Sequence, residues 1–155
     1  EAKKITSKKK VVVKAAKGIT VEAVSADEDV ILSTDTGLLS IAGDAASLGN
    51  IELTSSGAIV TGNVAAGKNA SLQTGQGITA GQIIADGAVN LAATSGNIAL
   101  SGTAKAGGSA LTVTATSGSI SAASLECCLG SRFRCDQCCH CEWCDQWLDH
   151  ARNGG

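Results

Sequence analysis

The cysteine and histidine residues, which are the side chains best suited to bind a transition metal, lie near the C-terminus. All seven cysteines lie between positions 127 and 144. Cys135, Cys138, Cys141 and Cys144 follow one another at intervals of three, with His140 among them. Thiolates and imidazoles at C-x-x-C intervals suit tetrahedral zinc or an iron–sulfur cluster, and a disulfide framework is the alternative in a secreted protein. The spacing therefore predicts a candidate metal site at these five residues.

A different interpretation of the same cysteines comes from the composition of residues 126–155. This segment departs from the preceding residues in composition, period and glycine placement. A TGC cysteine codon read one base later begins with GC and encodes alanine, and Asp and Gln codons likewise become Thr and Ser codons. Residues 126–155 are therefore predicted to be a Cys-rich tail that is frameshift-like and non-native, or irregular. A genuine metal or disulfide tail is the alternative.

The sequence before the Cys-rich tail offers mainly small and β-branched residues for a core. The chain has 19 glycines and no Pro, Met or Tyr, and its one Phe and two Trp all lie in the last quarter. Residues 18–125 consequently have only Val, Ile, Leu and Ala for a core. Without large aromatic side chains such a core is narrow, which suits an elongated fold better than a sphere.

Residues 30–125 repeat with a period near 20. Three apolar ladders and one glycine ladder keep the same register. They are Leu32, Leu53, Leu72, Leu91 and Val113; Leu39, Ile59, Ile78, Ile98 and Ile120; Ala45, Val64, Ile83 and Ala104; and Gly37, Gly57, Gly77, Gly96 and Gly118. A single unit cannot bury its apolar face alone, so copies must stack. The array therefore predicts an all-β fold, a parallel β-helix (β-solenoid) with coils of about 20 residues.

Each coil is expected to hold three short strands joined by tight corners. Strand side chains alternate, so Ile51 and Leu53 are predicted to point inward and Glu52 outward. Glycine at the corners is expected to supply the positive φ of tight bends. Polar side chains stacked along the axis can hydrogen-bond to one another.

A lysine-rich lead-in occupies residues 1–29 and is expected to form partial or irregular coils. Seven of the nine lysines lie between positions 3 and 17. Lysine runs can bind phosphate-rich partners, but a solvated edge of a longer fold is the plainer interpretation. The region lacks aromatic residues that could stack on bases, so no nucleic-acid partner is expected.

The array is too poor in carboxylates to predict an enzyme. Polysaccharide lyases and hydrolases with this fold need clustered carboxylates, often with Ca²⁺. Between positions 49 and 125 the carboxylates are Glu52 and Asp86, which fall in different repeats. The denser run at 27–29, with Asp35, could bind a cation but is more readily a solvated turn. We expect no catalytic residue and no cofactor, and no stretch is long enough to span a membrane.

The repeats resemble those of filamentous haemagglutinin and related two-partner-secretion exoproteins. The resemblance covers roughly residues 30–125 and is carried by segments such as 49–67 (GNIELTSSGAIVTGNVAAG) and 91–102 (LAATSGNIALSG). It implies a right-handed β-helix, export through an outer-membrane two-partner-secretion transporter, and a rod displayed at the bacterial cell surface. The family's secretion, receptor-binding and toxin regions have no matching segment here, so no functional residue carries over.

The resemblance implies a structural segment of a large secreted adhesin. Its partner is then a receptor or glycan on a host or neighbouring cell, and we expect the chain to be a fragment of a longer exoprotein. Two alternatives stay open. The rod is the stalk of a contact-dependent-inhibition toxin exoprotein, or the Cys-rich tail makes the chain a metal-binding module.

Overall fold

The computed structural model describes residues 2–127 and 132–135, with side chains from residue 3 to residue 127. Every regular element in this part of the chain is a β-strand. The strands are β1 (Ala2–Ser7), β2 (Val11–Ala15), β3 (Ile19–Ala26), β4 (Val30–Thr34), β5 (Leu39–Ile41), β6 (Ala45–Ser47), β7 (Ile51–Ser55), β8 (Ile59–Thr61), β9 (Val64–Ala66), β10 (Ala70–Thr74), β11 (Ile78–Ala80), β12 (Ile83–Ala85), β13 (Val89–Ala93), β14 (Ile98–Ala106), β15 (Leu111–Ala115), β16 (Ile120–Cys127) and β17 (Arg132–Cys135).

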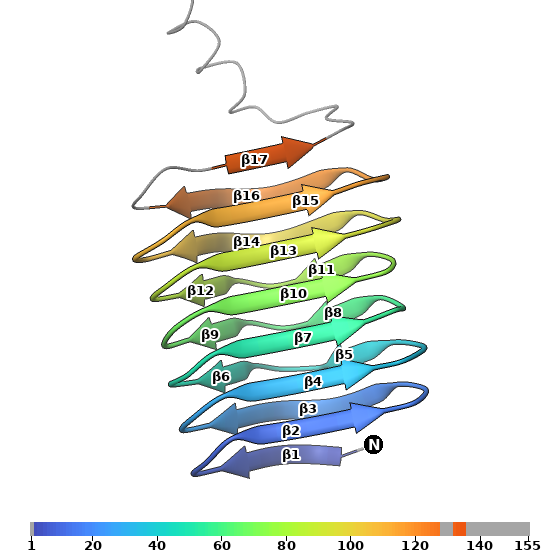
Figure 1. The fold of residues 1–155 in the computed structure, drawn as a ribbon, viewed down its shortest axis with the longest axis vertical. Helices are drawn as coiled ribbons and strands as arrows, with labels where there is room; N and C mark the ends of the chain where they lie inside the picture. The colour runs from blue at the N-terminus through green and yellow to red at the C-terminus, as the bar shows by residue number, and fades with distance from the viewer. Residues whose placement is uncertain (1, 128–131, 136–155) are drawn as a thin grey trace, which may run out of the picture.

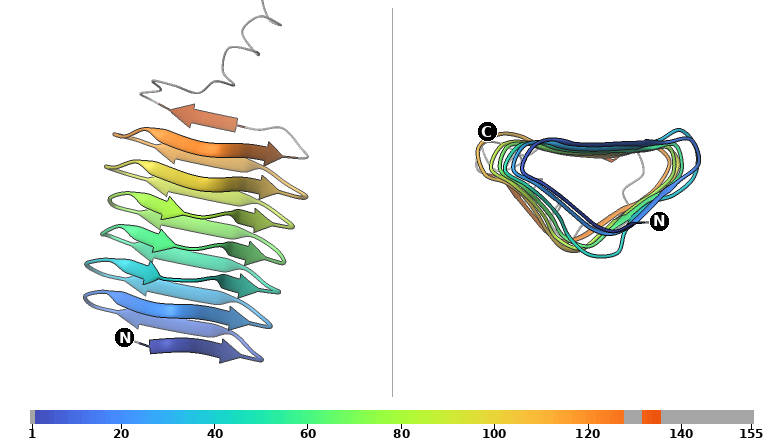
Figure 2. Two further views of the ribbon diagram at one scale, coloured as in Figure 1. Left: turned by 180° about the vertical axis from the view of Figure 1, so that it is seen from behind. Right: turned by 90° about the horizontal axis from the view of Figure 1, so that it is seen from below.

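The strands wind into a right-handed β-solenoid, which confirms the predicted fold. As the chain climbs, the strands of the near face run to the right and those behind run to the left (Figure 1). Seen along the axis, the coils superpose as a rough triangle with one long flat side (Figure 2). The structure is therefore a rod whose faces each continue from coil to coil.

Two parallel sheets make the walls of the rod. A 7-stranded sheet, in the order β17-β15-β13-β10-β7-β4-β2, forms the long side, called here the flat face. A 10-stranded sheet forms the other two sides, and the long strands β3, β14 and β16 run through both of them. Paired residues of successive coils on the flat face are 19 to 22 positions apart.

The three apolar ladders of the sequence are the inward rows of the solenoid. Leu32, Leu53 and Leu72 occupy paired positions of β4, β7 and β10, and their side chains are fully buried. The second row pairs Leu39 with Ile59 and continues to Ile120, and the third pairs Ala45 with Val64 and continues to Ala104. All three predicted registers are confirmed.

Alternation along each strand separates the core from solvent. In β7, Ile51 and Leu53 are buried whereas Glu52 is exposed, as the pattern predicted. Stacking copies of Leu, Ile and Val at the separation of adjacent strands, about 4.8 Å, removes both sides of each side chain from water. The core among the described residues is thus a continuous column of aliphatic side chains.

The role predicted for the corner glycines is wrong in most coils. Among the described glycines, Gly37 alone has a positive φ, of 91°. At the equivalent corners the coils approach so closely that an added Cβ would meet the backbone of an adjacent coil. The Cβ would overlap the carbonyl of Gly37 at Gly57 and that of Gly96 at Gly118. These positions require glycine for space rather than for an unusual dihedral angle.

Both flanks of the array contain strands that pair with it. In the lead-in, for which partial or irregular coils were predicted, β1 pairs with β3 and β2 pairs with β4, five residues on each strand. At the other end β16 continues to Cys127, and β17 pairs with β15. The rest of the segment 126–155 lies outside the described residues.

Candidate functional surfaces

The predicted metal ligands lie almost entirely beyond the part of the chain that the structure describes. Cys135 ends β17, in register with Ala115 of β15. Cys138, His140, Cys141 and Cys144 lie outside the described residues. Within the described residues no group of three or more His, Cys, Asp or Glu side chains could hold a metal ion. The metal site at the Cys-rich tail thus stays a prediction.

The two carboxylates between positions 49 and 125 occupy separate sites on the rod. Glu52 is exposed at the centre of β7 on the flat face. Asp86 is exposed at the corner that follows β12, in a later coil. A general acid and a general base must both reach the same bond, within about 10 Å of each other for a glycosidic bond. The two residues come from different sides of the solenoid, as the sequence suggested.

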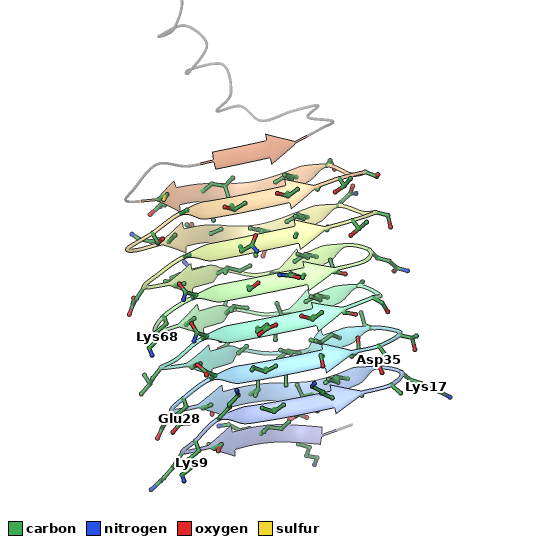
Figure 3. The ribbon with its side chains drawn as sticks, in the orientation of Figure 1. Lys9, Lys17, Glu28, Asp35 and Lys68 are labelled. Atoms are coloured by element: carbon green, nitrogen blue, oxygen red, sulfur yellow. The ribbon has the colours of Figure 1, made fainter. Side chains whose placement is uncertain are left out.

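The acidic run at 27–29 and Asp35 are likewise kept apart. Asp27, Glu28 and Asp29 turn the corner between β3 and β4, whereas Asp35 lies at the opposite corner, after β4. Figure 3 shows Glu28 and Asp35 on the two edges of the flat face. Strand β4 therefore separates Asp35 from the acidic run that the sequence grouped with it.

Asp29 begins a ladder of polar side chains along one corner. Its Oδ1 accepts hydrogen bonds from the Asn50 backbone N–H (2.8 Å) and from Asn50 Nδ2 (3.0 Å). Asn50 Oδ1 in turn accepts from the N–H (3.3 Å) and Nδ2 (3.0 Å) of Asn69, one coil further on. The ladder ends where Asn69 Oδ1 accepts from the Ala88 N–H at 2.8 Å. Polar stacking along the axis, which the sequence predicted, is confirmed here.

A second ladder follows the corner between the two short sides. The Oδ1 of Asp44 accepts from the N–H (3.2 Å) and Nδ2 (3.0 Å) of Asn63. Asn63 Oδ1 accepts from the N–H of Gln82 at 3.0 Å. The sequence signal that could have located both ladders is an Asp, Asn or Gln just before the first inward residue of a strand. Corner amide groups that would otherwise need water are satisfied in this way.

The environment of Asp29 favours its ionised form. The hydrogen bond from the Asn50 backbone holds the pKa of Asp29 below its usual value, and the Asn50 side chain adds to this effect. The positive charges of Lys10 and Lys68 lower the pKa further, while desolvation acts in the opposite direction. Because the carboxylate already accepts two hydrogen bonds, its role here is to fix the corner.

The flat face carries two outward rows of mostly small polar side chains. Residues in the same row are adjacent-strand neighbours, about 4.8 Å apart. From β4 to β15 the rows read Ile31, Glu52, Ser71, Asn90 and Thr112, and Ser33, Thr54, Gln73, Ala92 and Thr114. Most of these side chains are half-buried because their neighbours crowd them. The face is therefore broad, regular and almost uncharged.

A shallow groove marks the corner between the two short sides of the rod. Its lining comes from β8, β11 and β14 and their corners, including Thr61, Gly62, Gly81 and Leu100. The Thr61 Oγ1 is buried and has no hydrogen-bond partner among the described residues. One ordered water would satisfy this hydroxyl, and the groove presents no charged side chain to a ligand.

Comparison of the chain with protein-family models, with curated proteins and with solved structures finds no match. The resemblance to filamentous haemagglutinin thus rests on the repeat residues alone. None of the described residues forms a helix that is long and apolar enough to cross a membrane.

Proposed function

We propose that this chain is a structural segment of a large secreted adhesin of the bacterial cell surface. The observation that carries the proposal is the flat face, which repeats similar small polar side chains from coil to coil. Such a face offers the same weak contact many times, and linked weak contacts add to a strong attachment. Its partner would be a receptor or glycan on a host or neighbouring cell, and its export route an outer-membrane two-partner-secretion transporter.

A stalk role in a contact-dependent-inhibition exoprotein is the second candidate. Binding hot spots are enriched in Trp, Tyr and Arg, which bury large contact areas. The outward rows of the flat face from β4 to β15 hold none of these residues. A rod without such anchors suits a spacer that presents another domain, and this observation favours the stalk over a tight receptor site.

Cell attachment by the isolated chain separates the two candidates. Beads coated with the chain are applied to epithelial cells and to bacterial lawns, and the attached beads are counted. Gln73→Arg places a charge on the flat face, and Thr79→Arg places the same charge on a short side of the same coil. The adhesin proposal expects attachment that Gln73→Arg weakens and Thr79→Arg leaves intact. Equal attachment by coated and uncoated beads would instead support the stalk.

Metal content tests the third candidate, a metal-binding module in the Cys-rich tail. The purified chain is analysed for zinc and iron by mass spectrometry, beside the variant with Cys138→Ser and Cys141→Ser. Stoichiometric metal that disappears in the variant would establish the module. Sequencing the coding DNA across residues 118–155 tests the frameshift interpretation, since one inserted or deleted base should restore Ala, Gly, Thr and Ser repeats.

A further inference from the structure

The strongest concentration of charge on the rod is one basic coil near the N-terminus. Seven lysines, which we call the lysine band, ring this coil: Lys3, Lys4, Lys8, Lys9, Lys10, Lys14 and Lys17. All seven are exposed. Two come from β1, three from the corner before β2, one from β2 itself and one from the corner after it. Figure 3 shows Lys9 and Lys17 pointing outward from opposite corners of the coil.

The ammonium groups of the lysine band are exposed to an external anion, although the charge of Lys10 also acts on Asp29. No lysine of the band forms an ion pair within 4.0 Å among the described residues. The ion pair found there joins Lys105 to Glu126 at 3.1 Å. Seven like charges confined to one coil repel one another, and a bound polyanion would relieve that repulsion. The band therefore has the electrostatic character of a binding surface.

Carboxylates limit the band to the height of one coil. Glu28 lies above Lys9 at one corner, and Asp35 lies above Lys17 at the other (Figure 3). Glu22 and Asp27, also of the coil above, are exposed as well. A polyanion running along the rod axis would meet these carboxylates within one coil spacing. The lysines consequently attract a polyanion that follows the perimeter of the basic coil, and the carboxylates of the next coil repel a polyanion that runs along the rod axis.

This geometry restricts the kind of partner. A flat anionic surface touches one side of the rod, whereas the lysines come from β1, from β2 and from the corners before and after β2, so a flexible linear polymer reaches more of them. The band contains Lys and no Arg, and the compact ammonium binds phosphate as a point charge without the paired geometry of a guanidinium. No aromatic side chain accompanies the lysines, so base stacking is not available.

We propose that the lysine band binds a flexible, linear, phosphate-bearing polymer that is wrapped across the basic coil. When the polymer binds, the lysines displace its counterions into solution, so the affinity falls steeply as the salt concentration rises. If all seven lysines were engaged, raising salt from about 50 to about 200 mM would weaken binding on the order of 10³-fold. The proposal does not depend on the adhesin function, since it concerns the lysines of β1, β2 and their corners at one end of the rod and not the polar rows from β4 to β15.

Binding of fluorescent long-chain polyphosphate to the full chain tests the proposal. Lys14→Gln with Lys17→Gln removes two charges from the band, and Lys68→Gln with Lys105→Gln removes two charges elsewhere on the rod. The band variant is expected to bind at least about tenfold more weakly, and the control variant to stay within about twofold of the original chain. Circular dichroism establishes that both variants keep their strand content.

A gain of affinity provides an independent check. Glu28→Gln with Asp35→Asn removes the carboxylates that flank the band and is expected to tighten polyphosphate binding several-fold. Equal losses in the band and control variants would overturn the proposal, as would absence of binding at low salt. Tighter binding to a sulfated polysaccharide or to anionic phospholipid vesicles than to polyphosphate would overturn the assignment of the partner.

Discussion

Gly57 tests whether close approach of the coils, rather than backbone conformation, requires glycine at the corners. Its φ is not in the left-handed region, so alanine can adopt the same backbone conformation. Lower entropy of the unfolded chain would then stabilise Gly57→Ala by about 0.4–1 kcal/mol. The structure predicts the opposite sign, because the new Cβ would overlap the carbonyl oxygen of Gly37 and lie 2.6 Å from its carbon.

The size of the stability loss in Gly57→Ala depends on how strongly hydrogen bonds fix the backbone at this corner. Ser55 Oγ donates to the Gly37 carbonyl oxygen at 2.8 Å and accepts from the Gly57 N–H at 3.1 Å. Because this bridge ties the two coils together, the clash must be relieved by moving backbone. Overpacking of this kind costs about 1–3 kcal/mol. Subtracting a mid-range entropic gain of about 0.7 kcal/mol from a mid-range overpacking cost of about 2 kcal/mol, we expect Gly57→Ala to lower the free energy of unfolding by about 1.3 kcal/mol.

The assay compares Gly57→Ala with Gly107→Ala, where the nearest atom to the new Cβ is the Asp86 carbonyl oxygen at 3.1 Å. For Gly107→Ala we expect the free energy of unfolding to change by less than about 1 kcal/mol in either direction. Urea unfolding is followed by circular dichroism, with amide hydrogen exchange as a second probe because repeat arrays depart from two-state behaviour. If Gly57→Ala were as stable as the original chain or more so, the steric argument would be refuted.

Three further predictions concern the core and the corner ladder. Leu53→Ala is expected to cost about 3 kcal/mol in unfolding free energy because its side chain is fully buried, whereas Glu52→Ala should stay within about 0.5 kcal/mol. Asn50→Ala removes the acceptor of two hydrogen bonds from Asn69 and should cost about 1 kcal/mol, against little change for Asn90→Ala on the flat face. The free energy of unfolding measured as a function of acidic pH tests the contribution of Asp29 to stability. Its pKa is lowered in the folded state, so its contribution to stability is present above the ordinary Asp pKa of 3.8 and is lost as the pH falls through the lowered pKa. Replacing Asp29 by Asn should remove that part of the acid dependence, and an unchanged acid profile would contradict the assignment.

The sequence predicted the core better than the corners, for a physical reason. In a stacked solenoid each inward side chain lies on its counterpart one coil away. The recurrence of Leu32, Leu53 and Leu72 therefore encodes both burial and register. A recurring glycine is ambiguous, because an unusual dihedral angle and a lack of space both select it. In the structure Gly37 has both a positive φ and no space for a Cβ, whereas Gly57 lacks only the space.

The candidate sites were harder to predict than the fold. Whether two side chains meet depends on which corner or side each occupies, and the period alone does not fix this. The sequence grouped Asp35 with the run at 27–29, yet a whole strand separates them. The lysine band lies between positions 3 and 17 of the sequence but spreads over β1, β2 and the corners beside β2, so its shape emerges only once these strands are wound. The metal prediction depends on residues 136–144, outside the described part.

The uneven spacing of the coils has a consequence for how such a rod can be altered. Four residues join β4 to β5, whereas three join β7 to β8, yet the strands on either side stay paired in register. The corners therefore absorb insertions and deletions while the walls keep their stacking. A short peptide grafted between β14 and β15, a corner that is one residue longer than the corner between β12 and β13, should project sideways from the rod without interrupting it. Tags, epitopes or reporter loops could thus be placed at chosen heights along the molecule, one coil at a time.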